Sequence, residues 1–233
     1  MTAPVPRVRV LKQQRLALSR TFSHAREDFI VSPSNEEAIA ALDAWPAWPG
    51  GLLALIGPEG SGKTHLARAW AKISGAAILQ QGDGDTARLR GRPVLLEDAD
   101  RWTGDETLFH LINMAGAGGS LLLTGRLAPR LWATGLPDLR SRLNALPVAR
   151  IGPPDDAVLE GVLRKFFRER NIRPPGDVLA YLIRRIERSV ASAKDVVCRI
   201  DDLADAEKRD ITRALAREIL EPEDATLDLF DRS

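Results

Sequence analysis

Short apolar runs alternate with helical patterns over the first two thirds of the chain. The apolar runs that predict buried strands lie at 51–56, 76–79, 92–100, 120–125 and 147–151. Residues compatible with helices separate these runs, for example from 36 to about 44 and from 103 to 114. Strands that alternate with helices pair in parallel and are covered on both sides. The pattern therefore predicts an α/β fold, with a parallel sheet and helices on both faces.

The pattern changes after residue 151. Pro153 and Pro154 break the chain, and the segment from 155 to 220 contains only helical periodicity. The predicted helices are at 155–170, 175–188, 190–206 and 210–220. We therefore expect a small all-helical lid. The predicted division is an N-terminal arm at 1–26, a base at 27–152, the lid at 153–220 and an acidic tail at 221–233.

A phosphate-loop pattern, Gly-x-x-x-x-Gly-Lys-Thr, stands between the first predicted strand and the helix after it. The stretch expected to bind nucleotide is Gly57, Pro58, Glu59, Gly60, Ser61, Gly62, Lys63, Thr64 and His65. Its glycines let backbone amides turn toward an anion, and the helix N-terminus adds partial positive charge. Lys63 can reach the outer phosphates, and the Thr64 hydroxyl can bind magnesium. The pattern predicts ADP or ATP with Mg²⁺.

Polar side chains end two of the other predicted strands. Asp98 follows the third strand, where it can hold magnesium directly or through water, and Thr124 ends the fourth. The carboxyl ends of parallel strands share one edge of a sheet, so both residues are expected near the outer phosphates. Thr124 would then act as a sensor of the nucleotide.

Composition and net charge restrict the classes of protein to which the chain can belong. The chain has 233 residues and a net charge of +1, so no global field indicates direct nucleic-acid binding. Its one cysteine, Cys198, cannot form an internal disulfide, and no Cys/His metal spacing is present. No apolar run is long enough to span a membrane. We expect a cytoplasmic protein without membrane contact.

The loop, the Asp98 strand, Thr124, Arg142 and the helical lid, in this order, resemble the AAA+ ATPases of the DnaA group over about 27–220. The compact size and the stretch Leu-Pro-Asp-Leu-x-Ser-Arg-Leu at 136–143 are most similar to the Hda-type regulatory inactivators of that group. This resemblance implies a regulator that binds the DNA-loaded sliding clamp and promotes hydrolysis of DnaA-bound ATP. It would thereby limit replication initiation and contact DNA only through the clamp, and the resemblance leaves a homo-oligomer open.

The resemblance assigns roles to further residues. It implies that Phe29, Ile30 and Val31 line the adenine side of the nucleotide. It implies that Arg142 is an arginine finger, directed at the ATP of a neighbouring subunit. Two alternatives stay open, namely a surface ion pair of Arg142 with Asp138, and Arg140 as the finger.

Two segments resemble the short peptides by which proteins bind sliding clamps, a Gln followed by spaced apolar residues. In the arm, the matching residues are Gln13, Leu16 and Leu18. In the tail, the alternative match is Leu227, Leu229 and Phe230. An extended peptide that places apolar anchors in a pocket is a known mode of recognition.

The chain also departs from the family pattern. Ala99 stands where an acidic residue usually positions the attacking water, so we expect weak intrinsic hydrolysis. In a different register, Glu97 would hold magnesium and Asp98 would be the base, which favours an autonomous ATPase such as a helicase loader. In the lid, Ala191 replaces the usual nucleotide-contacting Arg, and Arg188 or Lys194 could compensate.

Overall fold

The computed structural model describes residues 29–80, 83, 86–102 and 104–221. Both predicted clamp motifs, Gln13 to Leu18 and Leu227 to Phe230, lie outside these ranges. They therefore remain predictions from sequence.

A five-stranded sheet forms the centre of the base, and all its neighbouring strands pair in parallel. In their order across the sheet, the strands are β2 (Ala77–Leu79), β3 (Pro93–Leu96), β4 (Ser120–Gly125), β1 (Leu52–Ile56) and β5 (Val148–Arg150). The predicted α/β class with a parallel sheet is confirmed. Leu55 of β1 pairs with Thr124 of β4, so the end of β1 lies beside that predicted sensor.

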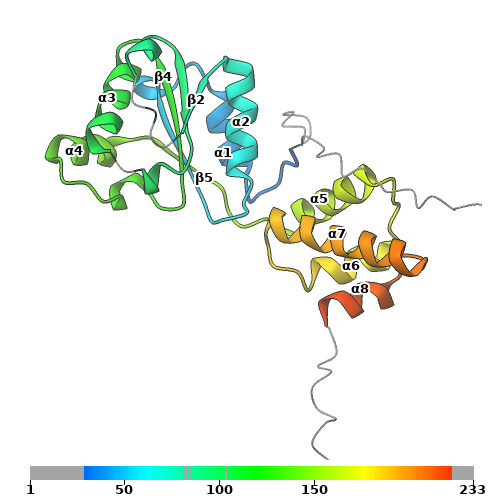
Figure 1. The fold of residues 1–233 in the computed structure, drawn as a ribbon. Helices are drawn as coiled ribbons and strands as arrows, with labels where there is room; N and C mark the ends of the chain where they lie inside the picture. Colours follow the sequence, from blue (N-terminus) through cyan, green and yellow to red (C-terminus); the bar gives the residue numbers. More distant parts are fainter. Residues whose placement is uncertain (1–28, 81–82, 84–85, 103, 222–233) are drawn as a thin grey trace, which may run out of the picture.

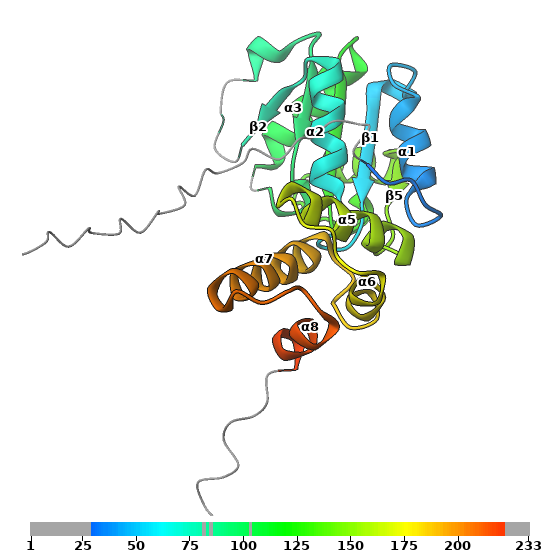
Figure 2. The ribbon, with the colours of Figure 1, turned by 90° about the vertical axis from the view of Figure 1, so that its right-hand side faces the viewer.

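Helices cover both faces of the sheet, as Figures 1 and 2 show. They are α1 (Glu36–Asp43), α2 (Lys63–Ser74), α3 (Asp105–Gly116) and α4 (Pro137–Ala145). Successive strand side chains point to opposite faces. Leu55 therefore packs in one core with α1 and α2, whereas its neighbour Ala54 belongs to the core under α3 and α4. Burial of each large apolar side chain contributes about 1.5–3 kcal/mol.

The chain after β5 forms four helices with a separate apolar core. They are α5 (Asp156–Glu169), α6 (Gly176–Ile183), α7 (Val190–Glu207) and α8 (Arg213–Leu220). Phe167 is fully buried at the centre of this core. Figure 2 shows α5 nearest the base and α8 farthest from it. Within the described ranges, no helix has both the length and the apolar character needed to cross a membrane.

Short 3₁₀ turns shape the connections between these elements. They are η2 (Pro49–Gly51), η3 (Ala87–Leu89), η4 (Ala99–Arg101) and η5 (Pro129–Leu131). The strand expected at 92–100 is shorter than predicted, because β3 ends at Leu96 and Asp98 adopts a left-handed conformation with φ of 50°. The helix expected at 175–188 also ends early, at Ile183. After β3, the Asp98 N–H bonds to the Thr124 hydroxyl and not to a neighbouring strand's backbone.

Candidate nucleotide-binding site

The phosphate loop requires glycine at specific points. Gly60 and Gly62 have φ of 71° and 98°, which L side chains rarely adopt. A Cβ added at Gly57 would lie 2.4 Å from the Ile151 carbonyl oxygen, and one at Gly60 would lie 2.4 Å from Ser189 Cβ. The loop is therefore packed between the end of β5 and the start of α7, with no space for side chains at these two points.

Lys63 lies inside this loop. It is the first residue of α2, is 7% exposed, and donates from Nζ to the carbonyl oxygens of Gly57 and Pro58, both at 2.8 Å. Burial lowers the pKa of the Lys63 ammonium, and the Asp98 carboxylate opposes that shift. A buried cation held on loop carbonyls is placed to exchange one of these acceptors for a phosphate oxygen.

The start of α2 offers further donors to an anion. Its N-cap is Gly62, so no side chain satisfies the first-turn amides. The Ser61 hydroxyl oxygen is buried and has no hydrogen-bond partner among the described residues. Unsatisfied donors at a helix N-terminus favour a bound anion. The residues present therefore fit a phosphate group.

The carboxylates that follow β3 lie near the loop, beside Thr124 of β4. Thr124 is 2% exposed, and its Oγ1 accepts the Asp98 backbone N–H at 3.0 Å. Glu97 Oε2 accepts from Arg68 Nε and Nη2 at 3.1 and 2.9 Å, which holds that carboxylate toward α2. Asp98 is the carboxylate that acts most strongly on the Lys63 pKa. Thr64, exposed at the start of α2, and Asp98 remain the predicted magnesium ligands.

A pocket of about 370 Å³ lies between the loop and the lid. Apart from the loop itself, it is lined by Phe29, Ile30, His65, Val158, Val162, Lys165, Phe166, Val190, Ala191 and Lys194. Its mixture of apolar walls and a few polar groups is typical of small-molecule sites. The lysine of α5, Lys165, was not anticipated from sequence. The helical spacing of Val158, Val162 and Lys165 on one face is the signal that could have identified it.

The segment before α1 contributes two of its three predicted residues to this pocket. The Phe29 ring lies 5.6 Å from the His65 ring, and Ile30 packs so closely on Gly161 that a Cβ there would lie 2.2 Å from Ile30 Cδ1. Val31 does not line the pocket and is 56% exposed. In this segment the pocket wall therefore ends at Ile30.

The lid touches the phosphate loop directly. The Val190 backbone N–H donates to the Gly60 carbonyl at 2.9 Å, which joins the first turn of α7 to the loop. Ala191 and Lys194 line the pocket. Arg188 instead donates to the Pro154 carbonyl and to Asp156 at the start of α5. Of the two residues expected to compensate for Ala191, only Lys194 lies at the pocket.

Comparison with known proteins relates this geometry to DnaA. No protein-family model matches the chain. Over 230 residues, it is 30% identical to the chromosomal replication initiator protein DnaA of Thermomicrobium roseum, an alignment that covers 85% of this chain. The chain spans 50% of the length of that relative.

Solved structures identify the corresponding domain. Domain III of DnaA from Thermotoga maritima has a TM-score of 0.71 at 20% identity, covering 85% of this chain and 96% of that one. The chain is homologous to DnaA and has the fold of its domain III. A DnaA bound to AMPPCP and single-stranded DNA has a TM-score of 0.61 at 19% identity. This match covers 79% of the present chain and 68% of that DnaA chain. An R170A variant of RuvB from Thermotoga maritima, which shares the AAA+ fold, has a TM-score of 0.65 at 18% identity. This match covers 90% of the present chain and 76% of the RuvB chain.

Arg142 of this DnaA homologue lies away from the pocket. It is exposed on α4, at the end of the base opposite the lid in Figure 1. Its guanidinium carbon lies 5.4 Å from the centroid of the Phe109 ring. Within the described ranges it forms no ion pair with Asp138, so that alternative is not observed. Arg140 donates from Nη1 to the Arg130 carbonyl at 3.0 Å and is thereby turned toward η5.

Proposed function

We propose that this protein is a nucleotide-bound regulator of the Hda type, which promotes hydrolysis of ATP held by DnaA. The observation that carries the proposal is the position of Arg142. The residue is exposed on α4, has no carboxylate partner among the described residues, and does not line its own protein's pocket. From this placement, an arginine finger would reach a nucleotide bound to another molecule and not the one in its own pocket.

The regulator would hold ADP or ATP in the pocket between loop and lid. The loop amides, Ser61 and Lys63 would bind phosphates, and Phe29 and Ile30 would contact the base. Thr64 and Asp98 would hold Mg²⁺, which supplies charge neutralisation at the phosphates when bound. The AMPPCP in a structurally similar DnaA supports an adenine nucleotide.

Arg142 would complete the site on DnaA. Phosphoryl transfer spreads negative charge over the transferred group, and a planar guanidinium supplied by a neighbour stabilises that charge. Such a finger is worth about 10³–10⁵ in rate. The stacking of Arg142 on Phe109 supports the role, because it limits the side-chain freedom lost on assembly.

Recruitment would come from the sliding clamp. Gln13, Leu16 and Leu18 form the first candidate peptide, and Leu227, Leu229 and Phe230 form the second. The clamp would place the regulator near DNA-bound DnaA, so contact with DNA through the nucleotide domain would not be needed. By converting DnaA from its ATP to its ADP form, the protein would restrict initiation.

The test is ATP hydrolysis by purified DnaA with this protein, in the presence and absence of DNA-loaded clamp. Turnover should rise only when all components are present, and Arg142→Ala should remove the stimulation. Arg140→Ala, on the same helix, is the matched control and should retain it. Deletions of 1–20 and of 224–233 then assign the clamp contact. Full stimulation by the Arg142→Ala protein would refute the finger assignment.

The autonomous ATPase is a second candidate, favoured by the carboxylates at the tip of β3. Glu97 is held by Arg68, and Asp98 follows it immediately, which is the order of a magnesium ligand and a base. This candidate predicts substantial hydrolysis by the protein alone, removed by Asp98→Asn and by Lys63→Ala. Hydrolysis by the isolated protein, with DnaA unaffected, would establish the autonomous ATPase in place of the regulator.

A further inference from the structure

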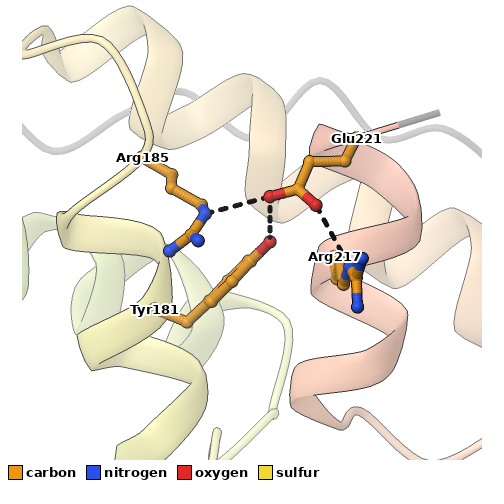
Figure 3. A network of polar contacts seen from close by, with 4 residues as sticks. All are labelled: Tyr181, Arg185, Arg217 and Glu221. Atoms are coloured by element: carbon orange, nitrogen blue, oxygen red, sulfur yellow. Dashed lines mark hydrogen bonds and ion pairs between the residues drawn. The ribbon is translucent and has the colours of Figure 1, made fainter. Parts of the chain in front are cut away.

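A second polar cluster lies on the lid, on helices that do not line the nucleotide pocket. It consists of Tyr181, Arg184 and Arg185 at the end of α6, and Arg213, Arg217 and Glu221 on or just after α8. These residues line a cavity of about 410 Å³ and a smaller one beside it. We call this set the arginine cluster; Figure 3 shows four of its members.

Glu221 is held at the centre of the arginine cluster. Its Oε1 accepts from the Tyr181 hydroxyl and from Arg185 Nε, each at 3.1 Å, and its Oε2 accepts from Arg217 Nε at 3.0 Å (Figure 3). These hydrogen bonds lower the pKa of Glu221, so the carboxylate is ionised at neutral pH. The cluster is therefore already arranged to bind an oxyanion, and the chain supplies one itself.

The positive charge exceeds what Glu221 neutralises. Four arginines line the two cavities, against the carboxylates of Glu221 and Asp177. Within the described part of the chain, Arg184 and Arg213 take part in no ion pair. Arg185 and Arg217 bond Glu221 through Nε, and their side chains stay 43% and 73% exposed. Guanidinium donors therefore remain at an open surface.

Arg213 adds a positive charge at a position where the helix itself does not favour one. It is the first residue of α8, where a cation opposes the partial positive charge of the helix N-terminus. Its guanidinium lies 5.3 Å from the centroid of the Tyr181 ring, and Arg185 occupies a position over the same ring at 4.3 Å. Each contact with the ring is attractive, but the two guanidinium groups repel each other, and a bound anion would reduce that repulsion.

The surface chemistry indicates the class of anion. The exposed large apolar side chains of the described residues are Val31, Ile73, Ile78, Leu127 and Leu131, and none lies on α6 or α8. A peptide partner ordinarily needs such anchors, whereas nucleic-acid interfaces are polar and basic. Guanidinium groups bind phosphate oxygens through paired donors.

We propose that the arginine cluster of α6 and α8 binds the phosphate backbone of a nucleic acid, and that Glu221 is an internal anion which competes for it. This proposal does not depend on the nucleotide pocket, which is lined by α5 and α7, so both sites can be occupied together. It adds a direct contact with DNA to a protein otherwise expected to meet DNA through a clamp.

The test is fluorescence anisotropy of labelled single-stranded and duplex DNA with the full-length protein, at about 50 mM salt and above. The Arg184→Gln/Arg213→Gln variant breaks no ion pair of the described residues, so it should fold. We expect about tenfold weaker binding, and a decrease of about 2 in the magnitude of the slope of log affinity against log salt. Arg164→Gln is the control, because Arg164 is exposed and paired with Glu160 on α5.

Glu221→Gln tests the competitor and should bind DNA at least threefold more tightly than the wild type. The proposal is refuted if the wild type binds neither DNA at about 50 mM salt, or if the double variant retains wild-type affinity and salt slope. It is also refuted if a glutamate-rich peptide displaces DNA at equal charge concentration, since the site would then belong to an acidic protein segment. Unchanged binding by Glu221→Gln would refute the competition. The better of the two DNA forms identifies the preferred ligand.

Discussion

Most helices of the lid begin differently from the helices of the base. None of α1, α2, α3 and α4 has a side-chain hydrogen bond at its N-cap. In the lid, α5, α7 and α8 each have one, from Asp155, Ser189 and Thr212, whereas α6 has none. The base helices are positioned by packing on a buried sheet, whereas the lid helices depend more on local signals.

This difference explains where each region can bind an anion. At α2, the bare glycine cap leaves backbone amides unsatisfied beside Lys63. At α8, Thr212 caps the Leu215 N–H, and the anion binding proposed there comes from side chains. The base thus offers a backbone site, and the lid offers a side-chain site.

The largest expected effect concerns the backbone site. Lys63→Ala should weaken binding of a fluorescent adenine nucleotide about 100-fold, because it removes the buried cation of the loop. Lys72→Ala, which alters an exposed residue of the same helix, should leave affinity unchanged. A loss below threefold for Lys63→Ala would show that the loop amides alone hold the phosphates.

The next largest effect is a loss of stability at the contact between the phosphate loop of the base and the lid. Gly60→Ala should lower the free energy of unfolding by about 2 kcal/mol, since the new Cβ would meet Ser189 and φ is positive. Gly75→Ala is a matched control with φ of 66° and nothing within 4 Å of the added Cβ. Denaturant unfolding should show a larger loss for Gly60→Ala. Equal losses would mean that the lid moves away without cost.

Removal of a helix N-cap in the lid should cause a smaller loss of stability. Asp155→Ala should destabilise the protein by about 1 kcal/mol at pH 7, while Asp155→Asn, which keeps an acceptor for the Val158 N–H, should cost less. Equal destabilisation by Ala and Asn would assign the effect to charge and not to capping.

The Asp155 contribution should also depend on pH. Burial would raise the pKa of Asp155, but hydrogen bonds from the Val158 N–H and the Ser32 hydroxyl outweigh it and place the pKa below its ordinary value. Its stabilisation is therefore present at neutral pH and is lost as pH falls below about 4. Unfolding curves of the wild type and Asp155→Ala should converge in acid. A constant difference between them down to about pH 3 would contradict this linkage.

The smallest effect concerns α4. Arg142→Ala should change the free energy of unfolding by less than about 0.5 kcal/mol, because the side chain is exposed and forms no ion pair among the described residues. The same variant is expected to lose stimulation of DnaA. A large loss of stability would instead make the stacking on Phe109 structural.

Much of the fold could be predicted from the sequence. The strand expected at 120–125 has these same bounds, and α5 and α7 begin and end within one residue of expectation. These elements have long periodic patterns and clear caps. The strand expected to reach Asp98 is shorter than predicted, because its end depends on a hydrogen bond to Thr124, far away in sequence.

The sequence by itself determined the phosphate loop, the parallel α/β sheet and the helical lid, because each follows from local periodicity, glycine positions and capping residues. Only the tertiary structure decided the pocket wall formed by α5, the exclusion of Val31 from it, and the convergence of α6 and α8 around Glu221. Those features depend on side chains from distant segments meeting in space. Such meetings are set by how all the elements pack together, which no single stretch of the chain encodes.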